Sequence, residues 1–344
     1  MKKRTRLFLV AAVGILVLGL GTGLLASYVG IQNFTIIGGN GPAELSYVPA
    51  DAKMIAFADV HDVANSELRQ KLRPFEPSQD AKNQFETATG IDIERDVDQI
   101  IAAAWQTAAD SPQGPPLVLA RGRFDADRIE SLIREHGGTV QDYKGKRLIV
   151  MTDHQEMAVS FVEPGLVAAG AAAAVRKAID TKQAGTGAVT DNAEVMKLIK
   201  DVDDGNAWAV ARFDALSTSQ LPKELAQQLP PINWLSASGH VDSGLRGTVR
   251  VEAKDEKSAD DLREVVRGFM ALARLQAGQK AEFAELVNSL ELGGQGTTVS
   301  LSFSLPASLI DAMAARTAQH SRPAPDAPAV PQRTPRPSAT VPSL

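Results

Sequence analysis

The chain of 344 residues contains no cysteine. It can therefore form neither disulfide bonds nor thiolate zinc sites, and it has no cysteine nucleophile. Anchoring as a lipoprotein is excluded too, because the residue that is acylated at such a cleavage site is a cysteine. If the folded part lies in an oxidising compartment, its hydrophobic core must supply the stability without help from disulfides.

Aromatic residues and net positive charge are also scarce. Phe, Trp and Tyr make up 5% of the chain, which argues against an aromatic-lined groove for sugars or stacked bases. The formal net charge is -5 and the sequence pI is about 5.6, so no overall basic field would attract nucleic acid. We expect no nucleic-acid partner.

Charged residues are missing from one long N-terminal stretch. Leu7 to Ile31 reads LFLVAAVGILVLGLGTGLLASYVGI, a basic stub at residues 1–6 precedes it, and the next charged residue is Glu44. About 20 apolar residues in a helix span the hydrocarbon core of a bilayer, and basic residues stay on the cytoplasmic side. The stretch predicts a single-pass anchor in the cell membrane, with the body outside the cytoplasm.

A cleaved signal peptide is the alternative for this stretch. Such a peptide has a shorter apolar region and a small-x-small cleavage site. Before Ala26 and Ser27, the positions that require a small residue hold Leu24 and Leu25. The length of the run and these two leucines favour an uncleaved anchor over a poor cleavage site that would release a soluble protein.

Residues 32–44 contain Gly38, Gly39 and Gly41 and predict a flexible spacer between the membrane and the body. A phosphate-binding loop would need a buried strand before it, a helix after it and usually a lysine. The sequence around these glycines offers none of these, so we interpret the segment as a spacer.

Beyond the spacer, short alternating runs and amphipathic segments predict an α+β fold in which a mainly antiparallel sheet packs with helices. A Gly/Thr/Ala-rich linker at 182–191 would separate a first unit, 45–181, from a related second unit, 192–318. Residues 319–344 are rich in Pro, Ala, Ser and Thr and predict a disordered tail. The strongest amphipathic helix is expected over 258–277, with one apolar side formed by Leu262, Val265, Val266, Phe269, Leu272 and Leu275.

An internal repeat supports the division into two units. The tetrapeptide Arg-Phe-Asp-Ala occurs at 123–126 and again at 212–215, and the run from Ala56 matches the run from Ala209 in pattern. Each copy follows an apolar run and precedes a helical period. Asp125 and Asp214 are therefore expected to be helix N-caps; the alternative is that the two aspartates form a site.

No motif for catalysis or metal binding emerges from the sequence. The five histidines, His61, His136, His154, His240 and His320, show no pair four residues apart on a helix, and no G-x-S-x-G element occurs. The acidic run from Asp92 vaguely resembles a calcium loop, but Val97 and Ala103 occupy the positions that require Gly and Glu. We interpret this run as a turn followed by an acidic first helical turn, and we interpret Trp105, Trp208 and Trp234 as core or sheet-face residues. We predict no catalytic residue, no cofactor-binding residue, no metal ligand and no cofactor.

Four segments carry a resemblance to a known family: VPADAKMIAFADV at 48–60, TGIDIERDVDQI at 89–100, ARGRFDADRIESL at 120–132 and YKGKRLIV at 143–150. They resemble a family of uncharacterised bacterial extracytoplasmic proteins that carry an N-terminal membrane segment or signal and a repeated α+β domain. The resemblance implies architecture and location for residues 45–316. It implies no catalytic residue.

Three functions are compatible with these features. The first is a non-catalytic, membrane-tethered module that binds or scaffolds, its partners being the membrane and an unknown envelope protein or lipid. The second is an extracytoplasmic hydrolase with scattered catalytic residues. The third is a lipid-handling module with an apolar cavity between the sheet and the Ala-rich helix expected over 171–180. A polar cleft with shifted pKa values would favour the hydrolase, and a wide apolar cavity would favour lipid handling.

Overall fold

The computed structural model describes residues 41–68, 86–87, 89–105, 116–152, 156–215, 229–277 and 281–305. The predicted anchor, most of the spacer, the helices expected over 81–89, 219–228 and 308–316, and the tail lie largely or wholly outside these residues. Within the described ranges, no helix has the length and apolar character needed to cross a membrane.

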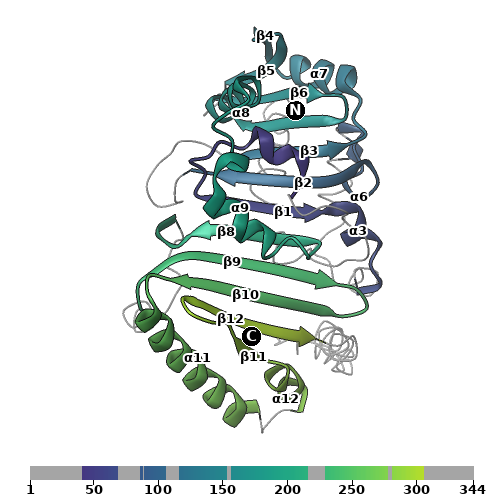
Figure 1. Cartoon of the computed structure of the whole chain (residues 1–344). Helices are drawn as coiled ribbons and strands as arrows, with labels where there is room; N and C mark the ends of the chain where they lie inside the picture. The colour runs from purple at the N-terminus through teal and green to yellow at the C-terminus, as the bar shows by residue number, and fades with distance from the viewer. Residues whose placement is uncertain are drawn as a thin grey trace, which may run out of the picture.

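All twelve described strands join one antiparallel sheet, which confirms the α+β class (Figure 1). Their order across the sheet is β11-β12-β10-β9-β8-β1-β2-β3-β7-β6-β5-β4. The strands are β1 (Met54–Asp59), β2 (Val97–Ala104), β3 (Leu117–Gly122), β4 (Thr139–Tyr143), β5 (Lys146–Thr152), β6 (Glu156–Glu163), β7 (Leu166–Ala171), β8 (Ala207–Arg212), β9 (Ile232–Val241), β10 (Leu245–Ala253), β11 (Glu291–Gly293) and β12 (Thr298–Leu305).

The strand order reads alike on both sides of the β1–β8 pair. Outward from β1 the strands are β2, β3, β7 and β6, and outward from β8 they are β9, β10, β12 and β11. On each side, counting β1 or β8 as the first strand, three strands that are consecutive in the sequence lie side by side. The strand that comes last in the sequence, β7 or β12, then lies beside the third. The β5–β4 hairpin extends only the first side. At the junction, Ala56 of β1 lies opposite Ala209 of β8.

One face of the sheet carries the main core. Figure 1 shows α8 (Ala172–Ala184) and α9 (Ala193–Lys200) on this face, with the 3-10 helix η2 (Ala43–Tyr47) nearby. Val175, Ala178 and Ile179 of α8 are fully buried in one cluster with strand residues such as Leu119 and Trp208. The space between α8 and the sheet is therefore filled by side chains, in place of the apolar cavity that the lipid-handling alternative requires.

The opposite face packs against the remaining helices. These are α3 (Val60–Asn65), α6 (Ile93–Asp96), α7 (Ala126–Glu135), α11 (Glu256–Ala277) and α12 (Ala281–Asn288). Ile133 of α7 packs on Ile149 and Val159, and Leu262 of α11 packs on Val299. Because side chains alternate across a strand, these contacts lie on the face away from Trp208.

Two boundaries differ from the sequence expectation. Glu44 belongs to η2 and is buried, so the folded body begins before residue 45. The segment 182–191, expected to be a linker, runs from the last turn of α8 into η4 (Val189–Asp191). Val189 is buried in the main core, and its N–H donates to the carbonyl of Val48 at 2.7 Å.

The acidic run from Asp92 forms one helical turn. Asp92 caps α6 by accepting from Glu94 N at 3.0 Å, so the expected acidic helical turn is confirmed, but its expected continuation as a helix is wrong. The chain then enters β2 directly. The short strand β11, elsewhere in the chain, was not predicted from the sequence either. A short apolar run such as that of β2 suits a buried helix and a strand equally, and only pairing with β1 and β3 decides between them.

The two repeated aspartates behave differently. Asp125 caps α7 and accepts from Arg128 N at 3.0 Å, as expected. Asp214 lies inside the 3-10 turn η5 (Phe213–Ala215), and its carboxylate accepts from Arg212 Nε at 3.1 Å and from Nη2 at 3.2 Å. Phe124 and Phe213 are both half-buried. The expected cap is thus confirmed at Asp125 and wrong at Asp214, which lies inside η5 and pairs with Arg212.

These roles predict unequal costs for the same substitution. Asp125→Ala removes an N-cap and should cost about 0.5–2 kcal/mol of unfolding free energy. Asp214→Ala removes an exposed ion pair and should cost about 0–1 kcal/mol, less than the first variant. Denaturant unfolding of both variants measures the difference, and a larger loss in Asp214→Ala would contradict these assignments.

Candidate functional site

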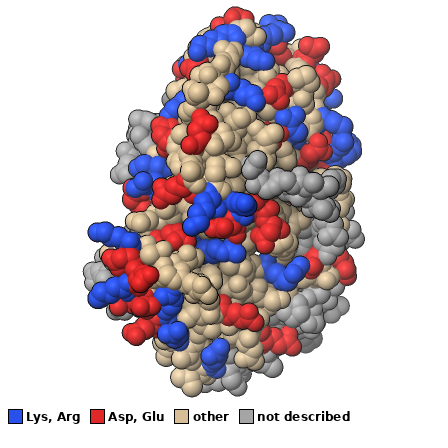
Figure 2. Space-filling view, in the orientation of Figure 1, with Lys and Arg blue, Asp and Glu red and all other residues tan. Residues whose placement is uncertain are grey.

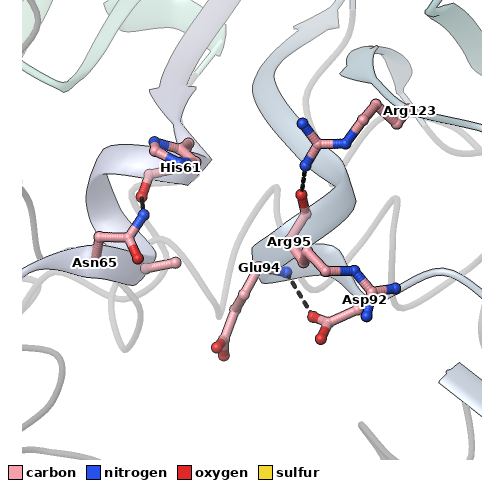
Figure 3. Close-up of a pocket in the computed structure, with 7 residues that line it drawn as sticks. His61, Asn65, Asp92, Glu94, Arg95 and Arg123 are labelled. Atoms are coloured by element: carbon pink, nitrogen blue, oxygen red, sulfur yellow. Dashed lines mark hydrogen bonds between the residues drawn. The ribbon is translucent and has the colours of Figure 1, made fainter.

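A polar pocket of about 270 Å³ lies between α3 and α6 on the second face of the sheet. In Figure 3, His61 and Asn65 of α3 form one wall, and Asp92, Glu94, Arg95 and Arg123 form the other. Ala64 completes the lining. The pocket thus brings together residues from α3, from α6 and from the turn after β3, which are distant in the sequence.

Each turn is fixed by local chemistry. Asp59 caps α3 through the N–H of Asp62 at 2.8 Å, in the way that Asp92 caps α6. At Gly122 a Cβ atom would lie 2.1 Å from the carbonyl oxygen of Asp96. Only glycine allows this approach, and it lets the next residue, Arg123, donate its N–H to the Asp96 carbonyl at 2.7 Å.

The charged groups of the α6 wall bind one another. Arg95 forms a two-pronged ion pair with Asp96, with both contacts at 2.9 Å. This hydrogen bonding lowers the pKa of Asp96 and raises that of Arg95. The guanidinium of Arg123 donates to the main-chain carbonyl of Arg95, as Figure 3 shows. These groups therefore hold the turn together.

A buried carboxylate lies behind the α3 wall. The Asp62 side chain is 6% exposed, and its Oδ1 lies 3.8 Å from Nδ1 of His61, a side chain that is 55% exposed. Asp62 Oδ2 has no hydrogen-bond partner among the described residues. Burial raises the pKa of Asp62, and burial together with the nearby Asp62 charge raises that of Asp59. The cluster has the chemistry to accept or release a proton beside the pocket.

A second polar network joins η2 to the sheet on the main-core face. Glu44 is 4% exposed; it accepts from Gln99 Nε2 at 2.8 Å and pairs with Arg121. Arg121 also reaches Glu163 at 3.3 Å, and Glu163 accepts from the hydroxyl of Tyr47 at 2.9 Å. Burial and this hydrogen bond raise the pKa of Tyr47. Sequence reasoning missed the network because Glu44 follows a glycine-rich segment and has no local motif.

The histidines and tryptophans lie where their surroundings explain them. His136 ends α7, and its Nδ1 lies 2.7 Å from the Leu132 carbonyl. His240 is in β9, while His154 and His320 lie outside the described residues. Trp208 and Trp234 are buried, and Trp105 packs against the main core. Within the described ranges, no group of three or more acidic or histidine side chains is arranged to hold a metal ion.

Comparison with known proteins identifies a structural similarity but no family. No protein-family model matches the chain, and no curated protein matches it. Among solved structures, the chain is similar to TP0453 in its crystal form I, with 12% sequence identity and a TM-score of 0.42. The match covers 79% of this chain and 96% of that chain. No family assignment and no residue role follow from a similarity of this size.

The raised pKa of Asp62 predicts a pH-dependent stability. A carboxyl group with a higher pKa in the folded state holds its proton more tightly there, so folding loses free energy as pH rises from the unfolded pKa, about 4, through the folded one. Asp62→Asn removes this loss. The variant should be more stable than the parent at pH 7, and the gain should shrink towards pH 4.

Urea unfolding at the two pH values measures this effect. Asp204→Asn is the matched control, because Asp204 is exposed in the turn before β8 and its change should stay within about 0.5 kcal/mol. An Asp62→Asn variant that loses stability at pH 7 would show that the ionised carboxylate stabilises the fold.

Proposed function

We propose that this protein is a membrane-tethered extracytoplasmic module that binds or scaffolds an envelope component, a protein or a lipid, and performs no catalysis. The N-terminal sequence carries the proposal. Residues 7–31 are apolar and uncharged, basic residues precede them, and the folded body follows them. This charge asymmetry orients a single span with its C-terminal side outside the cytoplasm.

The spacer would hold the body close to the bilayer. The chain is already packed at Gly41, where a Cβ atom would lie 2.7 Å from Cδ1 of Leu45. Residues 32–40 remain as the tether, and at about 3.3–3.6 Å per extended residue they reach roughly 30 Å. A body held within this distance suits a protein that acts at the membrane surface.

The distribution of polar groups supports binding over catalysis. The pocket is lined by His61, by charged and amide side chains and by a single alanine, and the α6 wall uses its arginines to hold its own turn. The hydrolase alternative is favoured by one observation, the raised pKa of Asp62 beside the pocket. None of the described residues that line the pocket carries a hydroxyl group, so a hydrolase would have to activate water with His61 or a carboxylate.

We also propose that the body is a duplicated α+β unit. The equal strand order on the two sides of the β1–β8 pair supports this, as does the position of Ala56 opposite Ala209. These residues occupy matching positions in the two sequence copies. A local two-fold axis through this pair would exchange β1 with β8. An experimental structure in which the two strand sets fail to superpose, Ala56 on Ala209, would reject the duplication.

Protease accessibility tests the location. Protease added to intact spheroplasts should cleave the body or its tail, while a cytoplasmic marker protein stays intact. A variant with Lys2, Lys3, Arg4 and Arg6 replaced by glutamine should show a weaker preference for this orientation, because its basic flank is gone. Protection of the parent chain until the cells are lysed would reject the proposed topology.

A further inference from the structure

The far half of α11 carries an uncovered apolar ridge. Phe269 is 46% exposed, Leu272 is 55% exposed and Leu275 is 75% exposed. The three residues are spaced three apart and form one row along the helix. We call these three side chains the α11 ridge.

The packing of α11 explains why the ridge faces outward. In the near half, Ala259 and Leu262 are buried against Ala253 and Val299 of the sheet. In the far half, Met270 is buried, whereas the three side chains of the ridge are exposed. In Figure 1, α11 runs obliquely away from the end of β10, past the β11–β12 edge. The apolar side predicted from the sequence is therefore used for the core in its first part only.

The charged residues of α11 also differ between its near half and its far half. Its acidic residues, Glu256, Asp260, Asp261 and Glu264, all precede the ridge. From residue 265 to 277 the charged residues are Arg267 and Arg274, both exposed. In Figure 2, red atoms gather at the upper end of α11, and its lower end is mainly tan with some blue. The ridge thus lies in a basic, amphipathic half-helix.

We propose that the α11 ridge inserts into the headgroup region of an anionic bilayer, with Arg267 and Arg274 held at its surface. Helices with aromatic and aliphatic residues on one face and arginines on the polar face bind at such interfaces, and anionic lipids strengthen the binding. The inference rests on the proposed tether. Three apolar side chains bind weakly alone, but a tether of a few residues keeps them at high effective concentration beside the bilayer.

The absence of cysteine allows a direct test on the full chain. Single-cysteine variants Leu272→Cys and Leu275→Cys, each labelled with an environment-sensitive fluorophore, are reconstituted through the anchor into phosphatidylcholine vesicles with and without phosphatidylglycerol. Asp260→Cys is the matched control, because the Asp260 side chain is 74% exposed and lies in the acidic near half of α11, before the ridge. Vesicle flotation reports the tether, and quenching by spin-labelled lipid reports insertion of the ridge.

The proposal expects blue-shifted emission and lipid quenching at 272 and 275, and an aqueous signal at 260. Quenching should increase with phosphatidylglycerol and fall several-fold when Arg267 and Arg274 are replaced by glutamate. Aqueous signals at both ridge positions in chains that float would overturn the ridge proposal and leave the tether standing. Chains that do not float would overturn both. A blue shift without lipid quenching would assign the ridge to a contact between copies of the chain and also overturn the proposal.

Discussion

The pairing of β1 with β8 is the contact on which the rest of the structure depends. It runs antiparallel from Met54 opposite Ala211 to Ala58 opposite Ala207. On the main-core face, Phe57 stacks on Trp208 with ring centroids 5.5 Å apart, and both are buried. Without this pair, each side of the sheet would end in an open edge strand whose backbone groups lack partners. Because of this pair, strands that lie more than a hundred residues apart in the sequence form one sheet.

A buried ion pair fixes the point at which the chain enters this body. The side chain of Glu44, a residue of η2, pairs with Arg121 of β3 and accepts a hydrogen bond from Gln99 of β2. Removing one partner would leave a buried charge without compensation, which is strongly destabilising. The network therefore holds η2 on the sheet, so the spacer must leave the body at a defined place. This gives the proposed tether a fixed origin.

Local patterns predicted most single elements, since alternation and turn chemistry act over a few residues. Asp92 and Asp125 both cap helical turns, as their sequence positions predicted. The order of the strands in the sheet could not be predicted from the sequence, because it depends on pairing between distant parts of the chain. Asp214 shows the limit at the level of one residue. The same tetrapeptide leads into a 3-10 turn, and there the carboxylate pairs with the neighbouring Arg212.

The α11 helix shows a different limit of sequence reasoning. A period of 3.6 residues identifies an apolar side but does not reveal how much of that side another element covers. Leu262 and Leu272 carry the same signal in the sequence, yet the first is buried and the second is exposed. Charged groups of the pocket find partners within the fold, so the pocket is explained largely by structure. The exposed α11 ridge is not, because large apolar side chains that stay in water contribute no burial free energy to folding. It is therefore the feature of the described chain that most calls for a partner outside the fold.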